Sequence, residues 1–224
     1  MRTETDILKE VIPLIKIDEK NLIYFFSKAK DPKWFKPLRD ADLFNPRSIP
    51  DPIKTEKGFT LSHWPQQFYL EHYSKSISEG DVSDKSAIDD FLNCLRKIQS
   101  TKENFLLARV LFLCVMRVPP KHLSVDDIKH AFTWLKESKA SDSLIETSVH
   151  EGFSLIVSRI SNNDCERKLF KELLSEVFTH SSKAGRKDEG LLFFSDYGLD
   201  KFEGSHFDAF ALSETKPYVL SDAI

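Results

Sequence analysis

Histidine is the residue type in this sequence best suited to acid–base or metal chemistry, and its spacing argues against both. The histidines lie at positions 63, 72, 122, 130, 150, 180 and 206, and none is within four residues of another. The HxxxH and HExxH patterns of helical zinc sites are therefore absent. His130 and His150, with Glu151 beside them, could approach each other across adjacent helices. We expect ordinary polar roles for these three, with no metal, no cofactor and no catalytic residue.

Serine and cysteine show no pattern of an activated nucleophile. No GxSxG motif is present, and neither residue type has a predictable histidine partner. Cys94, Cys114 and Cys165 are far apart, fall on expected helices and form no CxxC pair, which favours reduced, buried thiols. We therefore expect that the chain is not an enzyme.

A short basic segment, residues 181–187 (SSKAGRK), carries Lys183, Arg186 and Lys187. It lacks the GxxxxGK[ST] spacing of a phosphate-binding loop and does not follow an expected strand. We expect a solvated loop between helices. The three cations remain candidates for partner binding, because such a loop could also contact an anion or a nucleic acid.

Arg109 lies in an otherwise apolar stretch from Phe105 to Met116. A helix that is apolar nearly all round is a buried one. A buried guanidinium needs a carboxylate partner, since leaving it unpaired costs about 3–5 kcal/mol. Asp89 and Asp90 on the preceding helix are the expected partners. We predict a structural ion pair between stacked helices, with a ligand-binding arginine as the alternative.

This apolar stretch is the expected centre of the fold. Thr101 is its predicted N-cap, and Pro119 and Pro120 stop it because proline cannot continue the hydrogen-bond ladder. It is too short to span a bilayer, which needs about 20 apolar residues. We predict a central core helix with neighbours packed on several sides.

The first part of the chain predicts a series of short helices. One is expected over residues 4–16, interrupted at Pro13, and a second over residues 19–30, capped by Asp18. Asp31-Pro32 has the N-cap and first-position proline of a third helix, which carries Trp34. We assign Trp34 a structural role.

Residues 45–61 contain three prolines and are predicted to form an irregular loop. Ser62 is the expected cap of the helix that follows, with Pro65 in its first turn. We assign Trp64 a structural role as part of the apolar face of that helix. This face consists of Trp64, Phe68, Tyr69, His72, Tyr73 and Ile77.

A helix–turn–helix unit repeats from residue 83 onward. The expected caps of its first helices, Ser83, Ser124 and Asn163, are 41 and 39 residues apart, and Ser124 with Asp127 resembles a capping box. A second apolar helix follows in each unit, over Phe105 to Val118, Leu144 to Ile160, and more weakly near Leu191 to Phe202. A period of about 40 residues is typical of stacked helical pairs of the HEAT or armadillo type.

Spaced aromatics and prolines recur in the first half of the chain: Asp31-Pro32-Lys33-Trp34-Phe35, Leu38, Leu43-Phe44, Pro46, Trp64-Pro65 and Tyr69-Leu70. With this pattern, residues 18–118 resemble helical segments of large bacterial multidomain proteins. Some of those proteins carry ATPase or other effector modules and resemble components of phage-defence systems. The resemblance implies a helical sensor or scaffold segment of something longer, and it supplies no catalytic residue.

Composition is that of an ordinary soluble protein, with 41% hydrophobic and 30% charged residues in 224. A net charge of −3 gives no general attraction to nucleic acid or to anionic lipid. The first ten residues, MRTETDILKE, contain no apolar signal core, so we expect a cytoplasmic location and no membrane association.

These patterns predict an all-α fold, a HEAT-like right-handed α–α superhelix of stacked antiparallel helix pairs. Residues 1–80 form an N-terminal helical part and residues 83–224 the repeats, continuous with it as one array. The expected function is a binding or scaffolding module that recognises a protein, or alternatively a nucleic acid, through an extended surface. The other hypothesis is a regulatory or sensor domain of a larger ATPase or effector enzyme whose catalytic module lies outside this chain.

The last part of the chain is rich in aromatic residues. Seven of them lie between Leu191 and Tyr218, more than one short helix can bury. We expect some to close the end of the array and others, Phe207 and Phe210 among them, to dock a protein partner or a further domain of the same polypeptide.

Overall fold

The computed structural model describes residues 4–51, 53–54, 60–61, 64–98, 104–157, 159–160, 163, 165–166, 168–170, 172–173 and 175–176. In chain order its elements are α1 (Glu4–Ile17), α2 (Glu19–Lys28), the 3₁₀ turn η1 (Pro32–Trp34), α3 (Phe35–Asp40), η2 (Pro46–Ser48), β1 (Ile53–Lys54), β2 (Thr60–Leu61), α4 (Gln66–Glu79), α5 (Lys85–Arg96), α6 (Phe105–Met116), η3 (Pro120–His122), α7 (Val125–Glu137) and α8 (Asp142–Val157). The all-α prediction is confirmed for these residues, apart from the small antiparallel hairpin of β1 and β2. None of the described helices is long and apolar enough to cross a membrane.

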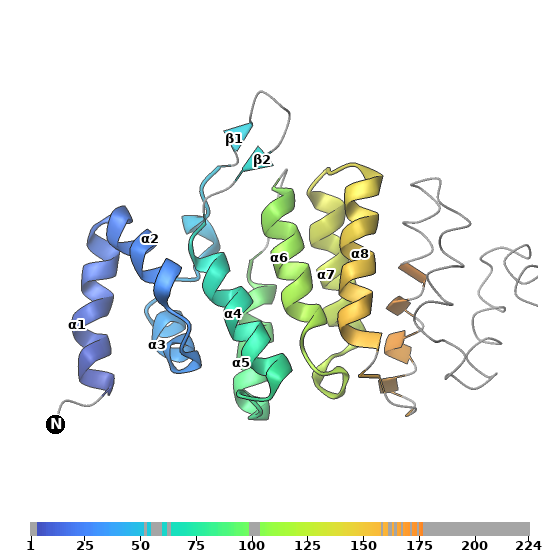
Figure 1. Ribbon diagram of the computed structural model, residues 1–224, viewed down its shortest axis with the longest axis horizontal. Helices are drawn as coiled ribbons and strands as arrows, with labels where there is room; N and C mark the ends of the chain where they lie inside the picture. Colours follow the sequence, from blue (N-terminus) through green and yellow to red (C-terminus); the bar gives the residue numbers. More distant parts are fainter. Residues whose placement is uncertain are drawn as a thin grey trace, which may run out of the picture.

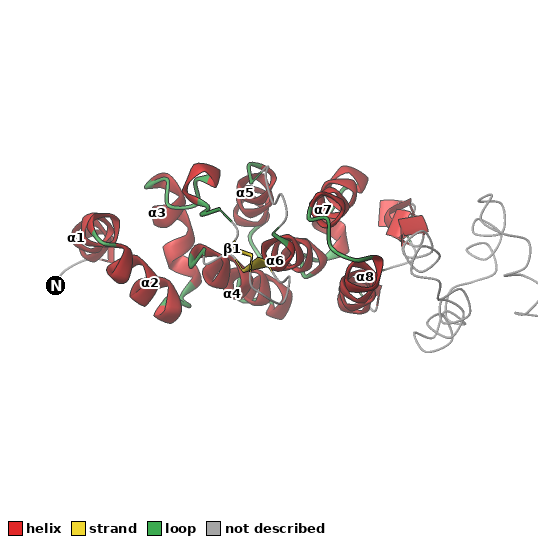
Figure 2. Cartoon of the chain, turned by 90° about the horizontal axis from the view of Figure 1, so that it is seen from above, coloured by secondary structure: helices red, strands yellow, loops and turns green. Residues whose placement is uncertain are grey.

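The helices stand in two rows. Seen from above in Figure 2, α2, α4, α6 and α8 form one row, and α3, α5 and α7 form the other. From α4 onward consecutive helices run in opposite directions, so the members of one row point the same way (Figure 1). Helix α6 contacts α4 and α8 in its own row and α7 in the other. It therefore occupies the central position that its composition predicts.

Helix α6 spans the predicted apolar stretch, but its start differs from the prediction. Asn104 is the N-cap, and its side-chain oxygen accepts a hydrogen bond from the backbone N–H of Leu107 at 3.2 Å. The predicted cap, Thr101, lies outside the described residues, and the helix begins after Asn104. Asparagine is as good an N-cap as threonine, and Asn104 stands directly before the apolar run.

The other caps show which local signals were sufficient. Asp18 caps α2 through the N–H of Lys20 at 3.0 Å, and Ser124 and Asp127 form the predicted capping box of α7. Two caps are displaced from their predicted positions. Asp84, not Ser83, caps α5 and accepts from the N–H of Ala87 at 2.9 Å. Pro65, not Ser62, is the residue before α4, so it precedes the first helical turn.

Three further differences concern the start of the chain. Helix α1 continues through Pro13 to Ile17 without interruption, and α2 ends at Lys28, two residues earlier than predicted. Asp31 does cap the next element, but that element is the 3₁₀ turn η1, followed by the short α3. Pro37 falls in the first turn of α3, where its missing N–H would have no partner within the helix.

Aromatic rings fill the core between the two rows in the first half of the chain. Phe35 of α3 stacks on Tyr73 of α4 with centroids 4.4 Å apart and meets Phe91 of α5 edge-on at 5.7 Å. Trp64 is 1% exposed, and its indole N–H donates to the hydroxyl of Ser48 at 3.3 Å. That hydrogen bond attaches the loop containing η2 to the start of α4.

Candidate functional site

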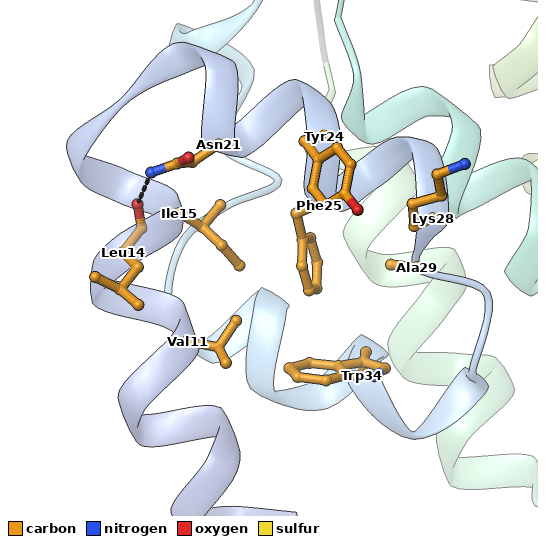
Figure 3. A pocket seen from close by; sticks show the side chains of 9 residues that line it. All are labelled: Val11, Leu14, Ile15, Asn21, Tyr24, Phe25, Lys28, Ala29 and Trp34. Carbon is orange, nitrogen blue, oxygen red and sulfur yellow. Dashed lines mark hydrogen bonds between the residues drawn. The ribbon is translucent and has the colours of Figure 1, made fainter.

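An apolar pocket of about 450 Å³ lies between α1, α2 and η1. Its lining consists of Val11, Leu14, Ile15, Asn21, Tyr24, Phe25, Lys28, Ala29 and Trp34 (Figure 3). Across it, Val11 and Ile15 of α1 face Phe25 of α2 and Trp34 of η1. Capping by Asp31 holds η1 in place, and the ring of Trp34 meets that of Phe25 edge-on at 5.2 Å. Trp34 thus forms part of the pocket wall and is partly exposed.

The rim of this pocket is unusually apolar for a protein surface. Leu14 is 57% exposed and Tyr24 is 69% exposed, the two highest values among the exposed large hydrophobic residues of the described chain. Asn21 donates from its amide nitrogen to the carbonyl oxygen of Leu14 at 3.3 Å, joining α2 to α1 beside the rim. Lys28 is the charged residue of the lining. The pocket can therefore bury apolar groups and attract a negative charge at one edge.

A second feature is a stripe of exposed apolar side chains across α4, α6 and α8. Phe68, Leu106 and Leu144 are 46%, 40% and 41% exposed, and each lies in the first turn of its helix. They are 38 positions apart in the chain, at 68, 106 and 144. The three helices follow one another in the row and run in the same direction. Their first turns therefore lie along the same edge of the row (Figure 1). We call these three residues the apolar stripe.

The same spacing relates the buried faces of these helices. The residues that follow the stripe directly are Tyr69, Leu107 and Ile145, and all three are buried. Farther along each helix, two more buried sets follow, Tyr73, Leu111 and Val149, and then Ile77, Val115 and Phe153. The predicted period near 40 residues rested on the caps of other helices. Aligning these apolar residues at a shift of 38 would have revealed the relation between the helices. It would not have shown that the set of Phe68, Leu106 and Leu144 is exposed and the other sets are buried.

Arg109 lies on α6 close to the stripe residue Leu106, and its surroundings differ from those predicted. Its guanidinium forms an ion pair with Glu151 of α8, and the two side chains are 37% and 38% exposed. The predicted partners were wrong: Asp90 pairs with Arg39 at 2.5 Å. Arg109 is thus half-buried, and its ion pair joins neighbouring helices of one row. In a half-exposed position such a pair contributes little stability, about 0–1 kcal/mol.

A second arginine joins the C-terminal ends of helices in the same row. Arg159 donates from Nη1 to the carbonyl oxygen of Arg117 at 2.6 Å, from Nη2 to that of Met116 at 2.7 Å, and from Nε to that of Leu155 at 2.8 Å. Its acceptors are carbonyl groups at the C-terminal ends of α6 and α8, where the helix dipole is negative. Burial lowers the pKa of this guanidinium below its ordinary value. The sequence singled out Arg109, but Arg159 has the stronger structural contacts.

The other row is joined by a buried carboxylate. The side chain of Asp127 on α7 is 3% exposed, and its Oδ1 accepts from Nε of Arg96 on α5 at 2.9 Å. Its Oδ2 accepts from the N–H and the hydroxyl of Ser124 at 2.9 and 2.5 Å. A single carboxylate therefore completes the α7 cap and attaches α5 to α7.

The structure does not bring the candidate histidines together. His130 packs edge-on against Trp134 with centroids 4.8 Å apart, and His150 lies 3.9 Å from Glu146. Within the described part of the chain, no group of three or more His, Cys, Asp or Glu residues could hold a metal ion. The partner-binding candidates Lys183, Arg186, Lys187, Phe207 and Phe210 lie outside the described residues.

The cysteines follow the prediction in part. Cys94 and Cys114 are buried free thiols, as predicted, and burial raises their pKa values to about 11 and about 12. Cys165 is exposed, so the prediction that it is buried was wrong. It lies directly before Glu166, which is buried.

The described helices thus present two apolar surfaces, the pocket and the stripe. Comparisons with protein-family models, with curated proteins and with solved structures found no match to this chain.

Proposed function

We propose that this chain is a helical-repeat module, a HEAT-like right-handed α–α superhelix, that binds a protein partner in the cytoplasm and acts as a scaffold. Two rows of antiparallel helices and the shift of 38 positions between α4, α6 and α8 support the repeat assignment. Modules of this kind work by displaying the exposed faces of successive helices along one surface.

The apolar stripe is the observation that carries the proposal. Packed helices lie about 8–10 Å apart, so three side chains in equivalent positions extend over about 16–20 Å. Large apolar residues aligned in this way mark an interaction site more strongly than single ones scattered over a surface. The ion pair of Arg109 and Glu151 provides a polar neighbour, as expected at the rim of an interface.

The chemistry of the stripe favours a protein over a nucleic acid. A nucleic acid requires several cations along its phosphate backbone, and Arg109 beside the stripe is already paired with a carboxylate. Apolar side chains of a partner would instead remove Phe68, Leu106 and Leu144 from water, each contributing up to about 1–2 kcal/mol.

Site-specific photo-crosslinking tests the proposal. A photoreactive phenylalanine analogue replaces Leu106 or Leu144 in cells that naturally produce the protein. The matched control places the same analogue at Thr133 or Lys129, exposed positions on α7 in the other row. We expect one protein to be crosslinked from both stripe positions and from neither control position.

Binding of that protein, once purified, is then measured against Leu106→Ser and Leu144→Ser variants. We expect at least a fivefold loss of affinity for each, the equivalent of about 1 kcal/mol. Crosslinks that are equally frequent at the control positions would overturn the proposal, as would unchanged affinity in both serine variants.

A further inference from the structure

The pocket between α1, α2 and η1 is a separate surface from the apolar stripe, and its rim shows what size of ligand fits it. Its volume of about 450 Å³ would suit a small molecule. A small molecule within it, however, would leave much of Leu14 and Tyr24 in water, since both are more than half exposed. Only a larger ligand that extends over both rims would bury them.

Two helices form the walls of this pocket, which favours a third helix as its occupant. Val11, Leu14 and Ile15 share one face of α1, and Lys28 lies one turn beyond Tyr24 and Phe25 on α2 (Figure 3). An amphipathic helix lays its apolar face into such a groove and inserts one or two large side chains. Phe25 and Trp34 form an aromatic floor against which an inserted leucine or phenylalanine can pack.

The charge around the pocket selects the flanking residues of the ligand. Residues 28–36 carry lysines at positions 28, 30, 33 and 36 and a single acidic residue, Asp31. Asp31 is engaged in capping η1. Among the described residues Lys28 has no carboxylate partner, although it lines the pocket. The ammonium group is therefore available for a carboxylate brought by the ligand.

We propose that this pocket binds an amphipathic helix of a partner protein, with a leucine or phenylalanine inserted against Phe25 and Trp34 and an acidic side chain beside Lys28. The interaction goes beyond the proposed function, because it involves other helices, another surface and a defined ligand charge.

Two synthetic helical peptides of about 16 residues test it, a length at which a helix can form in water. They share one stripe of leucine and phenylalanine and differ only in the flanking residues, which are glutamate in one and lysine in the other. Binding is followed by tryptophan emission. Trp34 lines the pocket, whereas Trp64 and Trp134 are each 1% exposed. A Trp34→Phe variant should lose the signal and so assigns it to the pocket.

We expect saturable binding of the glutamate peptide, about fivefold tighter than that of the lysine peptide, as one exposed ion pair would give. Lys28→Met keeps the apolar stem and should remove this preference. Lys20→Met, the same change at an exposed position of α2 outside the pocket, should preserve it. Leu14→Ser should weaken both peptides, whereas Ile23→Ser should weaken neither. All four positions are exposed, so the variants are expected to fold.

Four outcomes would overturn the inference. The first is no saturable binding of either peptide, and the second is equal affinity for both. The third is a preference for glutamate that survives Lys28→Met. The fourth is a different occupant: a dimer that Leu14→Ser converts to a monomer would indicate a second copy, and an emission shift with decanoate but with neither peptide would indicate a small carboxylate. Crosslinking from the apolar stripe is independent of all four results.

Discussion

The guanidinium of Arg159, just beyond α8, donates to the carbonyl oxygen of Met116, the last residue of α6, at 2.7 Å. The last carbonyls of a helix have no partner within it and need donors from elsewhere. Arg159 satisfies those of Met116 and Arg117 and also reaches the hydroxyl of Ser78 on α4 at 3.4 Å. One side chain therefore joins the ends of three helices of the same row.

Arg159→Met should destabilise the protein by about 1–3 kcal/mol, because the carbonyls of Met116 and Arg117 would lose their donors in a partly buried place. Arg159→Lys should retain part of the stabilisation through its remaining donor. Arg109→Met is the matched control, since Arg109 also joins α6 to α8 but is half-exposed, and its effect should stay below about 1 kcal/mol. Urea unfolding measures all three. Equal losses for Arg159→Met and Arg109→Met would show that the carbonyl contacts add nothing.

Asp127 should be the carboxylate in the row of α3, α5 and α7 whose removal destabilises the protein most. Asp127→Ala removes the acceptor of Ser124 and Arg96 at once, and we expect a loss of about 2–3 kcal/mol in the free energy of unfolding. Asp126→Ala, at the adjacent exposed position of α7, should cost less than about 0.5–1 kcal/mol, the contribution of an acidic residue near a helix N-terminus. The measurement is a denaturant titration of both variants. A smaller loss for Asp127→Ala than for Asp126→Ala would contradict the assigned contacts.

The three thiols should react in two classes. Thiolate is the reactive form, and burial raises the pKa of Cys94 to about 11 and that of Cys114 to about 12, while Cys165 is exposed. Near neutral pH, a thiol reagent should modify Cys165 quickly and the other two only in denaturant. Peptide mapping after brief labelling identifies the site. Rapid modification of Cys94 or Cys114 in the native protein would be inconsistent with their positions in α5 and α6.

Acid should weaken the fold partly through two histidines. Burial, with Lys75 and Lys30 nearby, lowers the pKa of His72 below 6.5, and burial with Lys121 nearby does the same for His122. A histidine with a lowered pKa in the folded state binds its proton more readily when unfolded. Its contribution to stability is therefore present above pH 6.5 and is lost as the pH falls from 6.5 through the folded-state pKa.

The double variant His72→Gln/His122→Gln should consequently lose less stability than the wild type between about pH 7.5 and about pH 5.5, a range that brackets the unperturbed histidine pKa. Urea unfolding at both pH values gives the two differences. A variant with the same or a greater loss than the wild type would refute this account.

Local signals in the sequence were sufficient where one short stretch determines the structure. The apolar run predicts a buried helix over Phe105–Met116, although not its cap. Ser124 with Asp127 predicts the α7 capping box, because backbone donors three residues away are the only partners required. Contacts between helices were not predictable in this way. Asp90 was a reasonable partner for Arg109 by sequence proximity, yet α8 is the neighbour of α6 on that face.

Exposure within an apolar helix was also invisible to the sequence. Phe68 belongs to the predicted apolar face of α4 but is 46% exposed, whereas the adjacent Tyr69 is fully buried. Both fit a helical period, and only the positions of α2 and α6 decide which one is covered. The pocket escaped prediction for the same reason, because its walls come from three elements whose relative placement depends on tertiary packing.

Gly152 provides a test of the closest packing between α6 and α8. A Cβ atom added there would lie 2.3 Å from Cε1 of Phe112 and 2.8 Å from Cγ of Met116, closer than any real contact. Both neighbours are fully buried, so neither can turn out into solvent.

Gly152→Ala should therefore destabilise the protein by about 1–3 kcal/mol, as expected for overpacking. On helix propensity alone the same change would stabilise by about 1 kcal/mol, so the sign of the effect distinguishes packing from propensity. Phe112→Leu removes ring atoms at the point of conflict, and the double variant Gly152→Ala/Phe112→Leu should be more stable than the sum of the two single changes predicts. Thermal melts of the wild type and the three variants give this coupling. A stabilising Gly152→Ala, or purely additive changes in the double variant, would mean that α6 and α8 do not approach each other at Gly152.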